Sequence, residues 1–262
     1  MTKEKGQPQA YGDESYWDNR YSQDVGSFDW YQRYGGLAPL INMYMPKTNN
    51  LLMVGCGNAV ISEDMVNDGY QTIMNIDISQ VVIDAMIEKY KDMPQLQYQR
   101  MDVRSLGFKD GEFDSILDKG MFDSLMCGSS APTSAASMIK EVRRVLKPGG
   151  VYMLITYGDP RVRIPHLKSE EAPWEIKLHV LRMLTRPGSK RAHEGTSRPI
   201  TEPVSLGEDL TLGPTFKLED PDLHYVYVCI KRGGNAVKRP SGDAKVDIKL
   251  CAKSQLISNY EV

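Results

Sequence analysis

The stretch LLMVGCGNAVISEDMV, residues 51–66, decides the fold class of this chain. Four apolar residues lead directly into Gly55-Cys56-Gly57, and apolar residues at helical spacing follow. This order predicts a buried β-strand, a tight turn and a helix. A glycine has no side chain to block a ligand from the backbone, and the start of the following helix presents free N–H groups. The stretch therefore predicts either a cradle for a ligand or a plain strand-to-helix turn.

The alternation of strand and helix continues along the chain. We expect strands over 50–55, 70–79, 96–103, 113–120 and 151–158, and helices over 37–45, 59–68, 80–92 and 133–146. Alternating strands and helices predict a parallel sheet with helices on both faces. Two later apolar segments, 174–183 and 224–232, predict an antiparallel hairpin. The fold class is therefore α/β, with a mostly parallel twisted sheet and a late antiparallel hairpin.

The domain organisation follows from where this pattern starts and stops. We expect a disordered N-terminus over 1–13, one domain over 14–232 and a polar C-terminal tail over 233–262. Between the late strands, residues 186–218 are polar and rich in Pro and Gly, which predicts either a lid or a disordered insertion. Its basic cluster, 186–198, fits a solvated loop better than a surface for an acidic partner.

Composition narrows the function classes. The chain has 262 residues, of which 41% are hydrophobic and 25% charged, and its net charge is −2. This balance argues against a general nucleic-acid or membrane-surface binder. No apolar run approaches the roughly 18 residues of a membrane span, and the polar N-terminus lacks the apolar stretch of a signal peptide. We therefore expect no nucleic-acid and no membrane partner, and the oligomeric state stays open.

The cysteines carry no metal or disulfide pattern. Cys56, Cys127, Cys229 and Cys251 are far apart and form no CxxC pair. This spacing does not fit a zinc site or a disulfide framework. We expect no bound metal and a reducing compartment, the cytosol first and the nucleus as the alternative.

Acidic residues stand at the ends of the second and third predicted strands. Asp77 follows Gly57 by twenty residues, where an acid can accept both hydroxyls of a ribose. It also fits a helix N-cap, although Ser79 suits that role better. Asp102 can accept from an adenine amino group beside the backbone of Val103, or it is a solvated loop acid.

Two cofactor classes fit these features. A dinucleotide site expects G-x-G-x-x-G, but the third glycine position is Val60. An NAD-dependent dehydrogenase is therefore the weaker interpretation. S-adenosylmethionine has the same ribose and adenine, with an amino acid in place of the pyrophosphate, and it gives Asp102 a natural role.

The motifs LLMVGCGNA, NIDIS, MDVRSLGF, FDSILDKGMFDSL and VLKPGGVYMLIT occur in this order. Together, over about 15–157, they resemble the class I S-adenosylmethionine-dependent methyltransferases. One departure is Met53, where many members carry an acid. The resemblance implies a seven-stranded Rossmann-like domain, S-adenosyl-L-methionine as cofactor and methyl transfer as the activity.

A narrower resemblance rests on YWDNRY…FDWY, GCGNA, DKGMFD and HYVYVCIKR. These segments are similar to the methyltransferase-like group that contains the elongation factor 1-alpha lysine methyltransferases. Ala59 replaces the family Ser, Met121-Phe122 replaces Thr-Leu, and the late strands are separated by an insertion. The resemblance implies a protein lysine as acceptor, with elongation factor 1-alpha as the candidate substrate.

The resemblance also implies the residues of the cofactor site. They are Trp17, Tyr21 and Trp30 over the methionine end, Gly55 and Gly57 against its backbone, Asp77 and Ile78 at the ribose and adenine, Asp102 and Val103 at the adenine edge, and Lys119 through its backbone or side chain. An aromatic ring attracts a nearby cation such as a sulfonium by up to about 2 kcal/mol. For Trp17 and Trp30 the alternative is plain packing of an N-terminal helix.

The acceptor side of the site is less defined. Asp118 and Asp123 flank the expected transfer point and are candidates to orient an amine. Asp118 alternatively binds the cofactor's amino group, and Asp123 alternatively caps a helix. Two rival functions stay open. One is a small-molecule methyltransferase with the insertion as a lid, and the other is a scaffold that binds cofactor while Met121 or Phe122 blocks transfer.

Overall fold

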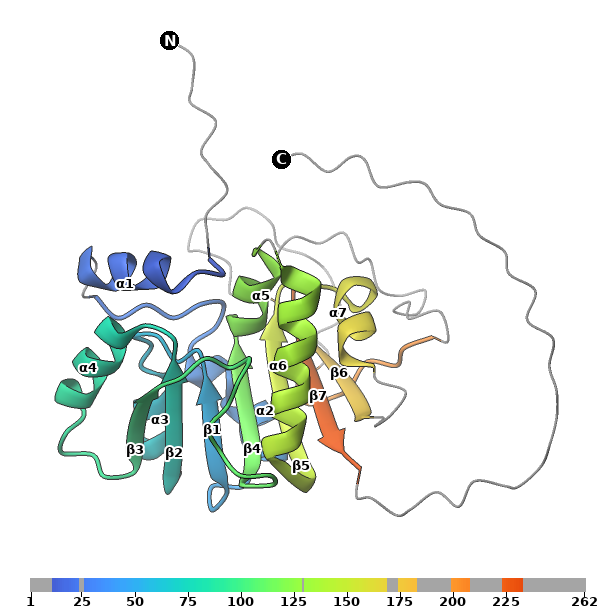
Figure 1. Cartoon of the computed structure of the whole chain (residues 1–262). Helices are drawn as coiled ribbons and strands as arrows, with labels where there is room; N and C mark the ends of the chain where they lie inside the picture. Colours follow the sequence, from blue (N-terminus) through green and yellow to red (C-terminus); the bar gives the residue numbers. More distant parts are fainter. Residues whose placement is uncertain are drawn as a thin grey trace, which may run out of the picture.

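Seven strands form a single sheet in the computed structural model, in the order β3-β2-β1-β4-β5-β7-β6 (Figure 1). The strands are β1 (Asn50–Val54), β2 (Thr72–Asp77), β3 (Leu96–Arg100), β4 (Phe113–Lys119), β5 (Leu146–Thr156), β6 (Trp174–Arg182) and β7 (Leu223–Lys231). The five strands from β3 to β5 are parallel, and β7 runs antiparallel to both of its neighbours. The structure describes residues 11–23, 26–128, 130–168, 174–182, 199–207 and 223–232.

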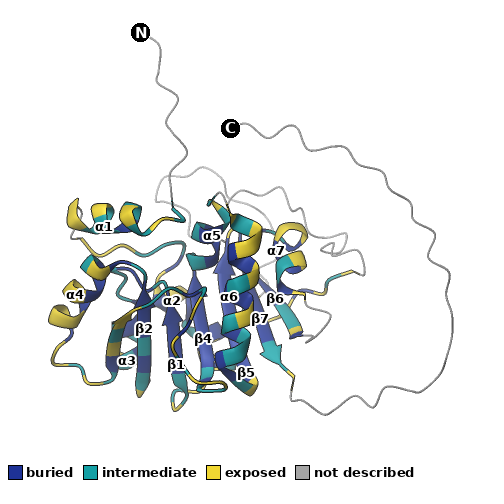
Figure 2. Cartoon of the chain, viewed as in Figure 1, coloured by how far each residue is buried: buried dark blue, intermediate teal, exposed yellow. Residues whose placement is uncertain are grey.

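Helices cover both faces of the sheet, as the alternating sequence pattern predicts. They are α1 (Glu14–Gln23), α2 (Tyr34–Tyr44), α3 (Ile61–Asn67), α4 (Gln80–Lys89), α5 (Met121–Met126), α6 (Ala131–Val145) and α7 (Pro160–Leu167). Successive side chains of a strand point to opposite faces. In β1, Leu52 and Val54 therefore join the core under α5, α6 and α7, whereas Leu51 and Met53 join the core under α2, α3 and α4. The central strands are buried on both sides (Figure 2).

Local signals in the sequence place the ends of several elements. Gly69 ends α3 with φ at +104°, and its N–H donates to the carbonyl of Val66. Ser79 is the N-cap of α4, because its hydroxyl accepts from the N–H of Val82 at 3.3 Å. The apolar face predicted for that helix is confirmed, since Val82 and Met86 are buried.

The start of β5 differs from the sequence prediction. The sequence predicts a strand from residue 151, after a helix stop at KPGG, but the strand begins at Leu146, which pairs with Phe113. The register then shifts before Ser115 pairs with Val151. Gly149 adopts φ of +80°, and a side chain on Gly150 would meet the carbonyl of Asp114 at 2.8 Å. The two glycines therefore allow the strand to continue through an irregularity that other residues would obstruct.

The late hairpin is confirmed. β6 and β7 pair antiparallel from Trp174 with Lys231 to Arg182 with Leu223. Part of the predicted insertion, residues 199–207, packs on the outer strand, where Val204 bridges to Leu178. The rest of that insertion, residues 1–10 and the tail 233–262 lie outside the described residues. None of the described helices is long and apolar enough to cross a membrane.

Candidate cofactor site

A cavity, partly open to solvent, lies beyond the carboxyl ends of the strands. Its walls come from the ends of β1, β2 and β4 and from the N-terminal segment, with α1 above them (Figure 1). Every residue predicted to bind the cofactor lines this cavity: Trp17, Tyr21, Trp30, Gly55, Gly57, Asp77, Ile78, Asp102, Val103 and Lys119. Tyr11 and Gly12, which the sequence assigns to a disordered terminus, form a turn and also line it.

The two glycines after β1 form a cradle that a side chain would fill. Their φ angles are +61° at Gly55 and +52° at Gly57, a region that other residues rarely adopt. A Cβ on Gly55 would stand 2.7 Å from the sulfur of Met121, and one on Gly57 would stand 2.7 Å from the hydroxyl of Tyr21. The absence of side chains here therefore lets Met121 and Tyr21 pack against the turn, whose backbone lines the cavity.

Asp77 is a buried carboxylate at the end of β2. Its oxygens accept from the N–H of Gly57 at 2.9 Å and of Ser79 at 3.0 Å. Burial raises the pKa of Asp77, and these backbone N–H groups lower it in part. A carboxylate oxygen has a second lone pair, so the group can still accept from a ribose hydroxyl. Because Ser79 caps α4, the side chain of Asp77 is placed for the cavity and for the glycine turn.

Asp102 is held by a neighbour that the sequence prediction did not include. The guanidinium of Arg104 donates to both carboxylate oxygens in a two-pronged fork, at distances between 2.7 and 3.0 Å. Burial raises the pKa of Asp102, but the hydrogen bonds from Arg104 outweigh it and leave that pKa below its usual value. Both residues line the cavity, so Asp102 is a fixed anion at its edge. The only signal in the sequence is the acid-x-Arg spacing in MDVR.

The side chain of Lys119 ties the N-terminal segment to the end of β4. Its ammonium donates to the carbonyl of Trp30 at 2.9 Å and lies 3.3 Å from the carboxylate of Asp29. Burial lowers the pKa of Lys119, and Asp29 opposes this. The side chain of Lys119 is thus already paired within the protein. Lys119 lines the cavity and holds the N-terminal segment over it.

Aromatic rings form that cover. Trp17 stacks on Tyr21 with ring centroids 5.7 Å apart, and Trp30 meets Phe28 edge-on at 5.0 Å. The guanidinium of Arg20 lies over the rings of Trp17, Phe28 and Trp30, at 5.9, 5.4 and 5.7 Å. Arg20 and Phe28 were not predicted, although both line the cavity. The aromatic residues therefore pack on one another and enclose the site at the same time.

Comparison with known proteins agrees with this geometry. Residues 52–154 match the family model described as "Methyltransferase domain". EEF1A lysine methyltransferase 4 of Mus musculus is 31% identical over 177 residues, which cover 64% of this chain and 69% of that protein. The chain belongs to the S-adenosylmethionine-dependent methyltransferases, in the group that contains the eEF1A lysine methyltransferases.

Two further matches of this methyltransferase are to a small part of a longer protein and to a solved structure. The eEF1A lysine and N-terminal methyltransferase of Bos taurus is 34% identical over 176 residues, 64% of this chain but only 25% of that longer protein. A SAM-dependent methyltransferase of Methanosarcina mazei shares the fold, with a TM-score of 0.50 and 19% identity over 78% of this chain and 99% of its own. The cofactor is S-adenosylmethionine, and the open glycine turn, the two carboxylates and the aromatic cover fit it.

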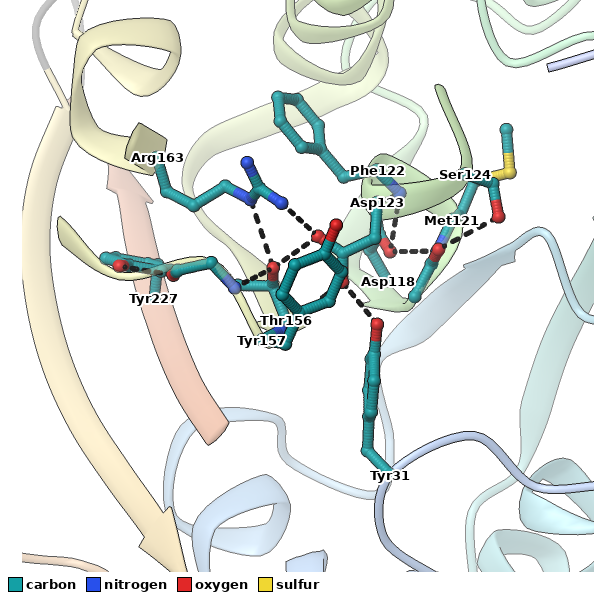
Figure 3. A network of polar contacts seen from close by, with 12 residues as sticks. Tyr31, Asp118, Met121, Phe122, Asp123, Ser124, Thr156, Tyr157, Arg163 and Tyr227 are labelled. Carbon is teal, nitrogen blue, oxygen red and sulfur yellow. Dashed lines mark hydrogen bonds and ion pairs between the residues drawn. The ribbon is translucent and has the colours of Figure 1, made fainter. Parts of the chain in front are cut away.

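The carboxylate of Asp118 faces the interior of the methyltransferase domain. It accepts from the N–H groups of Met121 at 2.9 Å and Phe122 at 3.2 Å (Figure 3). It also accepts from the hydroxyl of Tyr152 at 3.0 Å. Burial and the nearby Asp123 raise the pKa of Asp118 to about 7. Asp118 is not among the residues that line the cavity, and its contacts hold the first turn of α5.

Asp123, the third residue of α5, is also buried. It is not a helix cap, because its partners come from other segments: the hydroxyl of Tyr31 at 2.5 Å, Arg163 at 2.5 Å and the hydroxyl of Thr156 (Figure 3). Tyr31 connects this network to the cavity, since a Cβ on Gly120 would lie 3.4 Å from its ring and Gly120 lines the cavity. The sequence did not indicate Tyr31, Thr156 or Arg163.

Proposed function

We propose that this methyltransferase transfers its methyl group to a lysine amine of a protein, with elongation factor 1-alpha as the first candidate. The observation that carries the proposal is the place of Asp123, a buried carboxylate beside the cavity among the rings of Tyr31 and Tyr157. An anion among aromatic rings suits a basic amine on an alkyl chain. The names of the relatives, EEF1A lysine methyltransferase 4 among them, support the same acceptor class.

S-adenosylmethionine supplies an electrophilic methyl group on a positively charged sulfur. The residues of this chain position that group and exclude water. In the proposed site Gly55 and Gly57 admit the amino-acid end to the backbone, Asp77 accepts from the ribose, and Asp102 accepts from the adenine. Trp30 covers the reacting end.

The acceptor lysine must lose a proton before it can attack. With an ordinary pKa near 10.4, forming the neutral amine at pH 7 costs about 4–5 kcal/mol. Removal from water disfavours the ammonium and lowers this cost. The rings of Tyr31 and Tyr157 beside Asp123 contribute such an environment. The chain itself therefore contributes desolvation and orientation to the reaction.

The test is transfer of a labelled methyl group from S-adenosylmethionine into a cell extract that lacks this protein. The products are separated by size, and labelled protein is hydrolysed to identify the modified residue. We expect methyllysine in a band with the mass of elongation factor 1-alpha, and no band with Asp77→Ala. Label confined to the small-molecule fraction would instead establish the rival metabolite methyltransferase.

A second candidate, a scaffold that binds cofactor without transfer, is favoured by one observation. The side chain of Met121 packs against Gly55 inside the cavity, where the resembling proteins carry Thr. In that case S-adenosylhomocysteine binds in calorimetry, but the wild type labels nothing. Met121→Thr would then gain transfer activity, whereas a working enzyme already labels its acceptor without that substitution.

A further inference from the structure

His224, at the start of β7, has a buried ring nitrogen with no hydrogen-bond partner in the described part of the chain. The side chain is 5% exposed, and its Nδ1 makes no hydrogen bond among the described residues. Leaving a buried polar atom unpaired costs roughly 1–3 kcal/mol, so such atoms are rare in native proteins and often have a functional role. Burial lowers the pKa of His224, although Asp123 opposes this. The imidazole is therefore neutral near pH 7, and in the tautomer that carries its proton on Nε2 the Nδ1 atom can accept a hydrogen bond.

Tyr31 joins His224 to Asp123. Its ring centroid lies 4.6 Å from that of His224, and its hydroxyl donates to Oδ2 of Asp123 at 2.5 Å. Burial and the carboxylate raise the pKa of Tyr31, so the hydroxyl keeps its proton. The φ of Tyr31 is +64°, a strained value for a bulky residue that is found mainly at functional sites.

The two oxygens of Asp123 have different surroundings. Oδ1 faces inward and is held by Arg163 and Thr156. Oδ2 faces Tyr31 and the backbone N–H of Tyr157, which is 3.4 Å away. The Tyr157 side chain is 53% exposed, and its ring lies 6.4 Å from that of Tyr31. Oδ2 is therefore the oxygen on the side of Tyr31 and of the exposed Tyr157.

We propose that Oδ2 of Asp123 and Nδ1 of His224 form the seat of the acceptor, a primary amine at the end of an unbranched alkyl chain. This inference rests on the proposed function. A neutral primary amine has two N–H donors and one lone pair. Oδ2 of Asp123 and Nδ1 of His224, both beside Tyr31, can accept hydrogen bonds from the two N–H groups of the amine. The nitrogen lone pair then remains free to attack the methyl group. The rings of Tyr31 and Tyr157 suit the alkyl chain.

The bonding changes at this seat balance without a further reactant. The ammonium first releases one proton to solvent. The nitrogen lone pair then forms the N–C bond, the C–S bond breaks, and its electron pair stays on the sulfur, which becomes a neutral thioether. The nitrogen now carries the positive charge and remains beside Asp123. His224 accepts a hydrogen bond throughout and takes no proton.

Access to the seat requires Tyr31 to shift, because its hydroxyl already donates to Oδ2 of Asp123 and its ring lies against that of His224. The backbone of Tyr31 has a left-handed φ of +64°, which a bulky residue rarely adopts. The seat adjoins the cofactor cavity through Tyr31, whose ring would lie 3.4 Å from a Cβ on the cavity-lining Gly120, although neither Asp123 nor His224 lines the cavity itself. Variants of His224 therefore separate acceptor binding from cofactor binding.

The first experiment compares His224→Leu with His224→Asn in the full chain. The side-chain oxygen of Asn reaches the place of Nδ1, whereas Leu has no acceptor. We expect His224→Leu to lower kcat/KM for the protein acceptor by about tenfold, the loss of one hydrogen bond, and His224→Asn to restore most of it. Both should bind S-adenosylhomocysteine like the wild type in calorimetry. His166→Leu, a histidine of α7 in contact with the ring of Phe122, is the matched control.

The second experiment observes His224 directly and does not depend on turnover. The protein saturated with S-adenosylhomocysteine is titrated with Nα-acetyl-lysine methylamide, and the ¹⁵N resonance of His224 Nδ1 is followed. The control ligand is the norleucine analogue, which has the same chain without the amine. We expect a shift with the lysine compound and none with norleucine.

The combined outcomes distinguish the two proposals. Methyllysine formation by the wild type, with unchanged kinetics in His224→Leu and no resonance shift, would overturn the seat and leave the proposed function standing. Absence of any protein label, together with a shift caused by the lysine compound, would retire the protein acceptor and support the seat for another alkylamine. No label and no shift would overturn both.

Discussion

The sulfur of Met121 lies 2.7 Å from the point where a side chain on Gly55 would begin. The two residues are far apart in the sequence, because Gly55 follows β1 whereas Met121 opens α5. They meet at the cavity, where both form part of the wall. The glycine therefore serves two purposes: its backbone adopts φ of +61°, and its missing side chain leaves room for α5.

We predict that Gly55→Ala weakens S-adenosylhomocysteine binding by at least about tenfold. The methyl group would strike Met121, and the left-handed backbone costs a non-glycine residue roughly 1–2 kcal/mol. Calorimetry measures the affinity, and urea unfolding measures the stability. Gly35→Ala is the control, because nothing lies within 4 Å of its added methyl group and it stands in α2. Equal affinity in both variants would contradict the cradle.

Much of the cofactor-binding part of the site is predictable from the sequence. Buried apolar runs locate the strands, and the carboxyl ends of parallel strands share one edge of a sheet. The order of strands and helices along the chain therefore suffices to bring Gly55, Asp77 and Asp102 near one another. The cap at Ser79 is also predictable, because capping depends on residues only a few positions apart.

The acceptor side could not be predicted in the same way. Tyr31 meets Asp123 across 92 positions of the chain, and Lys119 meets Trp30 across 89. Such contacts depend on how the N-terminal segment crosses the strand ends, for which no local pattern exists. The same holds for the unpaired nitrogen of His224, since a histidine at the start of a strand gives no sign of burial.

We predict that Lys119→Met destabilises the protein by about 3–5 kcal/mol, because it leaves the carboxylate of Asp29 buried without a partner. The cofactor cover should loosen too, which lowers affinity for S-adenosylhomocysteine. Urea unfolding and calorimetry measure these effects. Lys147→Met is the matched control, since its pair with Asp114 is only half-buried and pairs near the surface contribute at most about 1 kcal/mol. Equal losses of stability and affinity in the two variants would show that the buried pair of Lys119 and Asp29 does not stabilise the cover.

The pKa of Asp118 predicts a pH dependence of stability. The pKa of Asp118 is about 7 in the folded protein, above the ordinary value of 3.8. The stability that Asp118 contributes is therefore fully present below pH 3.8 and is lost as the pH rises through about 7. The change is at most about 4 kcal/mol. Asp118→Asn stays neutral, so the difference in unfolding free energy between wild type and variant should fall from about pH 4 to about pH 7. Parallel curves would mean that Asp118 does not titrate in this range.

The fork between Arg104 and Asp102 predicts a specific loss of cofactor affinity. Arg104→Met frees the carboxylate and raises the pKa of Asp102, because the hydrogen bonds from Arg104 keep that pKa low. We expect S-adenosylhomocysteine to bind about three- to tenfold more weakly in calorimetry. Arg104→Lys keeps the charge without the fork and should recover only part of the affinity. The same acid-x-Arg fork joins Asp159 to Arg161 away from the cavity, so Arg161→Met is the control. If it weakened binding as much as Arg104→Met, the effect would be one of general stability, and Arg104 would have no role in holding Asp102 at the adenine edge.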